Sequence, residues 1–373
     1  MNAYRLKWFA WRVFLLASIF ALIADKGVAQ EISVGEGHLR VMTYNADEGT
    51  DFLHFQQATN PFQFLVAVGQ TLTEVRATQS RERMQAIARQ IINEKPVLVS
   101  LQEMDQLSSG PLDSATFTCG AMTLEFDMVQ DLLDALKTQG GDYTVAVRQQ
   151  QFVIPPIPGL IPPNNFLCAT VVNNVVLLAR TDLKSSVFSW GNPQSGIYQQ
   201  TLYFPTPGGL LPLPRAWVSV DAKYRGKPFR FIGTHLESAD PSIRRLQGVE
   251  LRSGPANTTL PTIVAMDSNA QAAPPFLDGG YIDFIRAGYQ DVWVDTLGSL
   301  PGFTCCQVQS LDNVHSQLSQ RIDLILTHGP VKAKQVTLFG IEVADKTISG
   351  LWPSDHAGVA AQLIIQMNGV ERP

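Results

Sequence analysis

The segment Ile263–Asn269 reads IVAMDSN, an apolar run that leads directly into a carboxylate, a hydroxyl and an amide. A short run of this kind is typical of a buried β-strand. Side chains two residues apart point the same way in extended backbone, so Asp267 and Asn269 share one face. The pair can therefore orient a water molecule and a substrate oxygen side by side.

Other segments combine short apolar runs with polar residues in the same way. They are Val41–Asn45, Leu98–Glu103, Phe231–His235, Gln320–Leu326 and Pro353–His356. Buried strands whose ends carry polar groups deliver those groups to a common rim of a sheet. We therefore expect one site that is assembled from the whole chain.

Helical and strand-like stretches alternate along the chain. Apolar residues at helical spacing predict helices over Ser80–Asn93 and Leu124–Thr138, and strands are expected over Val97–Leu101 and Tyr143–Val147. This alternation favours a layered α/β fold in which helices cover two packed sheets. With no repeat or long linker, a single domain over residues 30–373 is the simplest interpretation.

Two proline-rich apolar segments, Ile154–Pro163 and Phe204–Pro214, are predicted to be loops. Proline lacks the backbone donor and fixes φ, which excludes helix interiors and central strands. These segments are either packed surface connections or an apolar rim for a hydrophobic substrate such as a lipid head-group ester.

The N-terminus has the composition of a secretory signal peptide over residues 1–29. Basic residues precede the apolar run Val13–Ala24, and small residues follow it up to Ala29. A membrane anchor is the alternative, but a spanning helix needs roughly 20 apolar residues. We expect a secreted or periplasmic protein.

The bulk composition describes a globular, acidic chain of 373 residues, 45% hydrophobic, with a formal charge of -5. Removal of the basic leader would make that charge more negative. Such a chain exerts no broad electrostatic attraction on nucleic acid, although a metal site can still bind phosphate locally.

Four cysteines are compatible with disulfides in an exported protein, and three pairings are possible. We favour Cys119 with Cys168, which leaves the neighbours Cys305 and Cys306 as a pair. The spacing fits neither a structural zinc site nor a Cys-x-x-Cys redox motif.

Oxygen donors at three of the strand ends indicate a hard divalent cation. Asn45, Glu103 and Asp355 suit Mg²⁺, with Mn²⁺ or Ca²⁺ as alternatives. Taken singly, each of these residues is more often a cap or a surface charge. Glu103 is the least ordinary, because a carboxylate directly after a buried run needs a partner or a metal.

Two histidines lie beside carboxylates of the same set. His235 and His356 could each pass a proton if paired with Asp267 or Asp323, because a neighbouring carboxylate holds the tautomer and stabilises the charged imidazole. Arg321, by contrast, could simply pair with a surface carboxylate.

In their order along the chain these motifs resemble the endonuclease/exonuclease/phosphatase superfamily, as an exported bacterial-type member. The resemblance covers nearly the whole mature chain. It is carried by Tyr44-Asn45, Gln102-Glu103, Thr234-His235-Leu236, Asp267-Ser268-Asn269, Arg321-Ile322-Asp323 and Ser354-Asp355-His356. The superfamily includes DNase I-like nucleases, neutral sphingomyelinases and inositol polyphosphate 5-phosphatases. The resemblance implies a four-layer α/β sandwich, with Glu103 as the principal metal ligand and Asn45 and Asp355 close to the metal.

The same resemblance implies the catalytic roles. Asp267 would orient or activate the attacking water, and Asn269 would contact phosphate. The pair of His356 and Asp323 would stabilise or protonate the reacting phosphoryl group. His235 would act as a general acid toward the leaving group. Phosphoester hydrolysis depends mostly on positioning and charge stabilisation, which such groups can supply.

The chain departs from the family pattern at some positions. Met266 stands where the family usually has Gly before its Asp-x-Asn, and the extended signature of the inositol phosphatases is missing. The segment Gly302–Gln307 resembles one found in uncharacterised exported members, so it indicates location but no substrate.

The sequence thus predicts an exported, Mg²⁺-dependent phosphodiesterase or phosphomonoesterase. We expect it to be a monomer with no stable protein partner. Nucleic acid and phospholipid head groups both remain open as substrates. One alternative is a binding protein that kept the scaffold and lost turnover. Another is an unrelated α/β domain whose polar strand ends would lie more than roughly 10 Å apart, too far to share one metal and one phosphate.

Overall fold

The larger of two sheets has nine strands and contains the parallel pair β1 (Leu39–Asn45) and β2 (Leu98–Gln102). Its order is β16-β17-β1-β2-β7-β3-β4, with β5 paired to β3 and β6 paired to β7. The remaining bounds are β3 Gln106–Asp113, β4 Thr118–Cys119, β5 Thr123–Asp127, β6 Tyr143–Ile161, β7 Asn165–Arg180, β16 Val331–Phe339 and β17 Gly358–Ile365.

The smaller sheet has six strands in the order β14-β15-β13-β12-β11-β8. These are β8 Phe188–Ile197, β11 Ala216–Tyr224, β12 Lys227–His235, β13 Thr262–Asp267, β14 Gln290–Asp291 and β15 Asp323–His328. Two further strands, β9 (Leu202–Thr206) and β10 (Gly209–Leu213), pair only with each other and form a separate hairpin.

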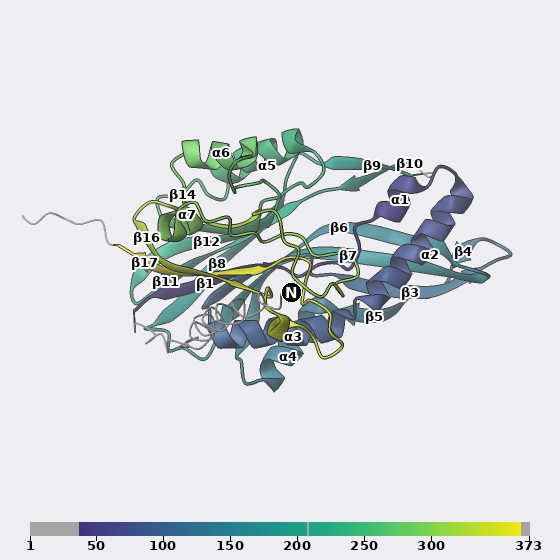
Figure 1. Cartoon of the computed structure of the whole chain (residues 1–373), viewed down its shortest axis with the longest axis horizontal. Helices are drawn as coiled ribbons and strands as arrows, with labels where there is room; N and C mark the ends of the chain where they lie inside the picture. The colour runs from purple at the N-terminus through teal and green to yellow at the C-terminus, as the bar shows by residue number, and fades with distance from the viewer. Residues whose placement is uncertain (1–36, 207–208, 367–373) are drawn as a thin grey trace, which may run out of the picture. The chain divides into compact units, whose positions relative to one another are not determined.

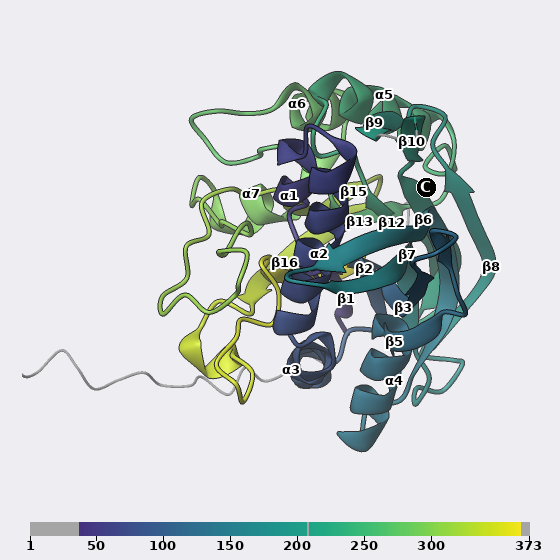
Figure 2. The ribbon, with the colours of Figure 1, turned by 90° about the vertical axis from the view of Figure 1, so that its right-hand side faces the viewer.

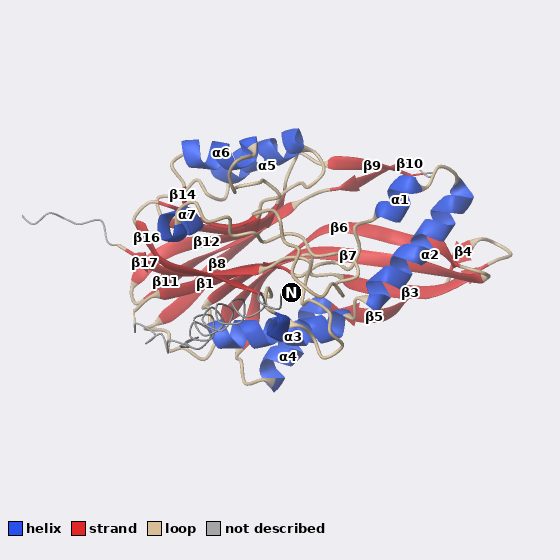
Figure 3. Cartoon of the chain, in the orientation of Figure 1, coloured by secondary structure: helices blue, strands red, loops and turns tan. Residues whose placement is uncertain are grey.

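Helices cover the outer faces of both sheets (Figures 1 and 3). They are α1 Leu53–Gln57, α2 Pro61–Ala77, α3 Ser80–Glu94, α4 Met128–Thr138, α5 Pro241–Ser253, α6 Gly279–Arg286 and α7 Val292–Leu297, with a 3₁₀ turn at Val343–Asp345. With α3 and α4 on one side and α5 and α6 on the other, the layers run helix, sheet, sheet, helix. This confirms the predicted four-layer α/β sandwich.

Alternation along the central strands separates three buried clusters. In β1, Val41 belongs to the cluster between the sheets, whereas Met42 belongs to the cluster under α3 and α4. In β13, Ala265 faces the other sheet and Met266 packs toward α5 and α6. Both faces of each central strand are therefore buried, so the polar groups these strands carry can reach a site only at the strand ends.

Helix α2 lies directly against the strand β6 (Figure 2). Gly69 and Gly159 permit this approach: a Cβ on Gly69 would lie 2.0 Å from the carbonyl oxygen of Leu160, and one on Gly159 would lie 2.6 Å from Val68. Larger residues at either position would push α2 away from the strand.

The helix predicted over Ser80–Asn93 is confirmed as α3, which extends one residue further. The prediction over Leu124–Thr138 is wrong at its start, because residues 124–127 belong to β5. Asp127 ends the strand and caps α4, since its carboxylate accepts from the amides of Val129 and Gln130.

The prediction that both proline-rich segments are loops is wrong. Most of Ile154–Pro163 lies in β6, an edge strand that pairs only with β7. A register shift between Ile154 and Ile157 accommodates Pro155 and Pro156. Residues 204–206 and 209–213 form the β9–β10 hairpin. Proline is tolerated in a sheet at edge strands and bulges. Its presence therefore excludes a central strand but not an edge strand.

The computed structural model describes residues 37–206 and 209–366, of which His38 onward form one compact unit. The predicted leader lies outside these ranges. Within them no helix is long and apolar enough to cross a membrane. The favoured cysteine pairing is confirmed: Cys119 is bonded to Cys168, with Cα atoms 5.7 Å apart, and Cys305 is bonded to Cys306.

Candidate active site

The strand ends bring the predicted polar residues together. His235 at the end of β12 is in register with Asp267 at the end of β13, and Asp267 is in register with Asp323 at the start of β15. In the other sheet, Asn45 ends β1, and β17 begins just after His356. The two sheets therefore present their polar ends at one edge of the sandwich.

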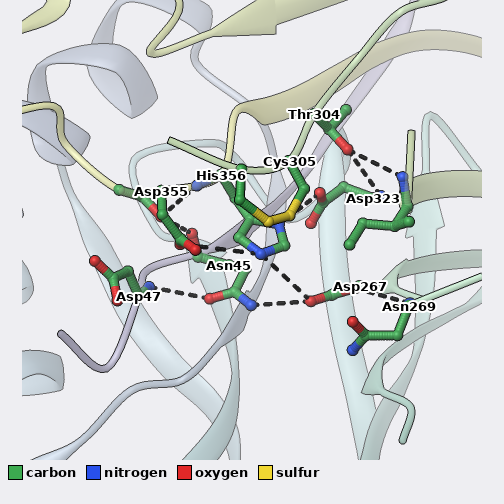
Figure 4. The surroundings of a disulfide bond; sticks show 12 residues. Asn45, Asp47, Asp267, Asn269, Thr304, Cys305, Asp323, Asp355 and His356 are labelled. Atoms are coloured by element: carbon green, nitrogen blue, oxygen red, sulfur yellow. Dashed lines mark hydrogen bonds and ion pairs between the residues drawn. A yellow bond between two sulfur atoms is a disulfide. The ribbon is translucent and has the colours of Figure 1, made fainter. Parts of the chain in front are cut away.

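The buried amide of Asn45 joins the two sheets. Its Nδ2 donates to Glu103 Oε1 and to Asp267 Oδ2, both at 2.9 Å, and its Oδ1 accepts from the amide of Asp47 at 3.0 Å. Figure 4 shows the contacts of Asn45 with Asp267 and Asp47. Because the amide of Asp47 fixes the amide orientation, Asn45 directs its NH₂ group at the carboxylates. In this arrangement Asn45 positions Glu103, and the role of Asn45 as a metal ligand stays a prediction.

Glu103 lies one residue beyond β2 in a left-handed conformation, with φ of 57°. That turn directs its carboxylate away from the sheet, where Oε2 accepts from the amide of Glu48 at 3.0 Å. A non-glycine residue with positive φ costs conformational energy, and such residues concentrate at functional sites.

Three carboxylates line the cavity here, and their charges interact: Asp47, Glu103 and Asp355. Burial raises the pKa of Asp355 well above its usual value, and Asp47 and Glu103 raise it further. Burial likewise raises the pKa of Asp47, opposed by Arg83 and assisted by Glu103. Mutual repulsion of this kind is relieved when a cation lies between the carboxylates.

Asp47 was missed by the sequence analysis. It follows Asn45 by two residues in a polar stretch and resembles an ordinary turn residue. The neighbouring Glu48 was also missed, and burial together with Glu103 and Asp105 raises its pKa well above the usual value.

His356 and Asp323 form the predicted pair. Nδ1 of His356 lies 2.8 Å from Asp323 Oδ2, and its Nε2 lies 3.9 Å from both Asp267 Oδ2 and Asp355 Oδ1. Burial by itself lowers the pKa of His356. The carboxylates of Asp323, Asp355 and Asp267 outweigh burial and hold the pKa well above its usual value, which favours the charged imidazole.

The disulfide of Cys305 and Cys306 lies against His356 in Figure 4. Cys305 makes isolated β-bridges with Gln320 and with His356. The hydroxyl of Thr304 accepts from the backbone amides of Ile322 and Asp323, both at 3.1 Å. The segment Gly302–Gln307, which was expected to indicate only an exported protein, therefore packs against the His356–Asp323 pair.

His235 has the opposite electrostatic environment. Arg215 Nη1 lies 3.1 Å from its Nδ1, and Asn269 Nδ2 lies 3.1 Å from its Nε2. Burial, then Arg215 and His356, lower the pKa of His235 well below its usual value, which favours the neutral ring. Arg215 was missed, because it lies at the end of the proline-rich segment, far from any polar cluster in sequence.

Asp267 lies between the two histidines. Its Oδ1 accepts from the amide of Asn269 at 2.9 Å, and its Oδ2 lies 3.4 Å from His235 Nε2. Burial, together with the charge of Asp323, raises the pKa of Asp267 to about 6. Asp267 and Asn269 both line the cavity, but the predicted extended backbone is wrong, because β13 ends at Asp267 and Asn269 has φ of 50°.

The donor set fits a hard divalent cation. The carboxylates of Glu103 and Asp355 are 16% and 27% exposed, so they reach the cavity, and Asp47 joins them from the buried side. Among the described residues, two groups of this site have ligand atoms within 4.8 Å of one another: Glu103, His235 and Asp267, and Asp267, Asp323 and His356. Oxygen donors with room for water and phosphate are what Mg²⁺ requires.

Two buried arginines hold the loops of the site. Arg83 of α3 donates to the carbonyls of Ala46, Asp47 and Pro353, which ties the loop after β1 to the loop before His356. Arg321 pairs with Asp291 at 2.7 Å, and both are buried. Of the alternatives for Arg321, the surface carboxylate is therefore wrong, because its partner Asp291 is buried.

These residues open into a cavity of about 570 Å³. Glu103, His235, Asp267, Asn269, Asp355 and His356 line its polar end. The alternative in which the polar strand ends lie apart is excluded by the hydrogen bonds and ion pairs that connect them.

No family model matches the chain, and no curated protein matches it. Solved structures do match. An endonuclease/exonuclease/phosphatase family protein from Bacteroides thetaiotaomicron is 16% identical, with 88% of this chain and 98% of that chain covered and a TM-score of 0.54. A mannosyl-6-phosphatase from Bacteroides thetaiotaomicron VPI-5482 is also 16% identical, covers 87% of this chain and 99% of its own, and has a TM-score of 0.50.

The human nocturnin catalytic domain with bound sulfate is 17% identical, covers 88% of this chain and 95% of its own, and has a TM-score of 0.50. At these identities the likeness establishes the fold. The chain has the DNase I-like fold of the endonuclease/exonuclease/phosphatase proteins, as its motifs predicted.

Proposed function

We propose that this chain is an exported phosphoesterase that depends on a divalent metal, with a leader over residues 1–29 and a catalytic domain over residues 30–373. The observation that carries the proposal is the bridge from Glu103 through Asn45 to Asp267, which places a carboxylate cluster beside the cationic His356 in one cavity. The phosphatase among the structural neighbours supports the same class of reaction.

Glu103, Asp355 and Asp47 would hold the cation, and Asn45 would position Glu103. The donor set favours Mg²⁺, with Mn²⁺ or Ca²⁺ as alternatives. A bound divalent cation supplies charge neutralisation and polarisation of phosphoryl oxygens.

Asp267 would orient the attacking water as a carboxylate, and Asn269 would contact a phosphate oxygen. His356, held charged by Asp323, would stabilise the charge that develops on the phosphoryl group and can donate a proton at Nε2.

His235 would act differently from the role that the resemblance implies. A general acid must carry a proton to give, whereas the lowered pKa of His235 favours the neutral ring. We therefore assign protonation of the leaving group to His356 and assign to His235 the positioning of Asn269 and Asp267, from which it lies 3.1 and 3.4 Å.

The test is hydrolysis by the leaderless protein of 4-nitrophenyl phosphate, methyl 4-nitrophenyl phosphate, plasmid DNA and sphingomyelin vesicles, each with Mg²⁺ and with chelator. We expect metal-dependent cleavage of at least one substrate, and a loss of about 10²-fold or more in Glu103→Gln. Asp142→Asn, which changes an exposed carboxylate outside the cavity, is the matched control and should retain full rate. Wild-type protein that cleaves none of the four would favour the binding-protein alternative.

Export and monomeric state belong to the same proposal. Expression of the full chain with its own leader should yield a secreted or periplasmic protein whose N-terminus lies near Gln30, as mass spectrometry would show. Light scattering should give the mass of one chain. A product that retains residues 1–29 in the membrane would favour the anchor.

A further inference from the structure

The cavity has a second half that the proposed chemistry does not use. Beyond the polar end its walls are apolar, and three parts of the fold supply them. The lining side chains there are Phe52, Phe55, Phe64, Phe152, Ile154, Ile157, Leu202, Phe204, Leu211 and Leu213. They come from α1 and α2, from the proline-bearing edge strand β6, and from the β9–β10 hairpin, which reach toward one another in Figure 1.

The hairpin presents one apolar row to the cavity. Leu202 and Phe204 alternate with exposed residues along β9, and their partners in register, Leu213 and Leu211, also line the cavity. Tyr203, between them, is 59% exposed and does not line it. Among the described residues the hairpin pairs with no other strand, so the side chains of this row face the opposite walls of the cavity.

An aromatic cluster forms the facing wall. The rings of Phe55 and Phe64 meet edge to face with centroids 5.3 Å apart, and Phe52 lies 6.0 Å from Phe55. All three rings are partly exposed. Aromatic and aliphatic walls around a few polar groups are typical of sites for small amphiphilic ligands.

The charge of the cavity argues against a polyanion. Arg215 is the only Arg or Lys among the described lining residues, and His356 is the other group whose charged form is favoured. The lining carboxylates are Asp47, Glu48, Asp51, Glu103, Glu237, Asp267 and Asp355. Nucleic acid binding depends on several Lys or Arg contacts to successive phosphates. One phosphate at the metal end, followed by an uncharged apolar group, matches this distribution better.

We propose that the substrate is an amphiphilic phosphate ester, with its phosphate at the polar end and its hydrocarbon chain along the apolar row of the hairpin. The proposal rests on the proposed phosphoesterase function for the reaction itself. The hydrocarbon site is a separate property and is tested separately.

The first experiment compares alkyl 4-nitrophenyl phosphate diesters with methyl, butyl and octyl chains, at concentrations below micelle formation. Each methylene removed from water strengthens binding by about fourfold. We expect kcat/KM to rise by at least tenfold from the methyl to the octyl ester. Equal values along the series would overturn the proposal while leaving the phosphoesterase intact.

Two neighbouring residues of β9 form a matched pair of variants. Phe204→Ser removes a ring from the cavity wall and should lower the octyl-to-methyl preference by roughly tenfold, with little change for the methyl ester. Tyr203→Ser removes an exposed ring from the other face and should keep the preference. Leu211→Ser, across the hairpin from Phe204, should repeat the effect of Phe204→Ser.

Binding provides a readout that does not depend on turnover. Octylphosphonate and methylphosphonate cannot be hydrolysed at their carbon–phosphorus bond, and calorimetry with Mg²⁺ should show at least tenfold tighter binding of the octyl compound to the wild type but not to Phe204→Ser. If no ester is cleaved but this difference remains, the proposed function fails and the hydrocarbon site stands. If both phosphonates bind equally, the hydrocarbon site is wrong.

Discussion

Burial lowers the pKa of both histidines of the site, but the net shifts of the two pKa values have opposite directions. His356 faces the carboxylates of Asp323, Asp267 and Asp355, whereas His235 faces the guanidinium of Arg215. The carboxylates outweigh burial at His356 and favour its charged form, whereas Arg215 adds to burial at His235 and favours the neutral ring.

His356 and Asp323 should act as one unit. We expect His356→Gln and Asp323→Asn each to lower kcat by about 10²- to 10⁴-fold, because Asp323 holds the charged ring in place. The double variant should be little worse than either single variant, since residues that act together are not additive. The measurement is kcat for the two single variants and the double variant, together with circular dichroism to verify folding. Effects that multiply would contradict a shared role.

The acidic groups predict a distinct pH dependence of stability in the absence of metal. The pKa of Asp267 is raised to about 6 from 3.8. Its stabilising contribution is therefore complete below the unfolded value and is lost as the pH rises through about 6. Burial also raises the pKa of Asp355, which acts in the same direction.

A cation that binds the ionised carboxylates should reverse this loss. We expect the increase in Tm on adding Mg²⁺ to be several degrees at pH 7.5 and much smaller at pH 5, because protonated carboxylates are poor ligands. Thermal unfolding with Mg²⁺ and with chelator at both pH values is the measurement. A Tm that is insensitive to Mg²⁺ at pH 7.5 would contradict a metal at this site.

At the scale of elements, α3 holds two loops of the site in place through the side chain of Arg83. The guanidinium of Arg83 ties the loop after β1 to the residue Pro353, so the carboxylates of Asp47 and Asp355 stay together. The sequence predicted the helix from its apolar face but gave no reason to expect a buried arginine on it.

We expect Arg83→Met to destabilise the protein by about 3–5 kcal/mol, since it leaves buried carbonyls and Asp47 without their cation. Arg89→Met on the same helix should lower the free energy of unfolding by less than about 1 kcal/mol. Arg89 makes one partly buried hydrogen bond, to the carbonyl of Lys346. Urea unfolding of both variants in chelator separates this effect from metal binding. Equal losses in the two variants would show that Arg83 does not organise the loops.

At the scale of the whole molecule, the sequence was informative wherever a polar residue ended a buried strand. Asn45, Glu103, His235, Asp267 and Asp323 all have this position, and the topology brings them to one edge. Strand order and the meeting of two sheets are decided by packing between distant segments, so no local pattern predicts which strand ends become neighbours.

The residues that were missed share a physical reason. Arg215 and Asp47 lie in connecting segments, and their importance comes from contacts with His235 and with Glu103 and Asp355, which only the folded chain brings near. The proline-rich segments were misassigned for a related reason, because an edge position depends on which strands pair elsewhere. Their apolar character was nevertheless a usable signal, since both segments line the cavity.

The most direct test of the account is the rate of methyl 4-nitrophenyl phosphate hydrolysis as Mg²⁺ is titrated into metal-free protein, measured for the wild type and for Glu103→Gln. The account predicts a saturable rise in the wild type from a rate near zero, and a rate at least about 10²-fold lower in the variant. Hydrolysis that proceeds equally well in chelator, or a Glu103→Gln variant with the wild-type rate and Mg²⁺ dependence, would contradict it.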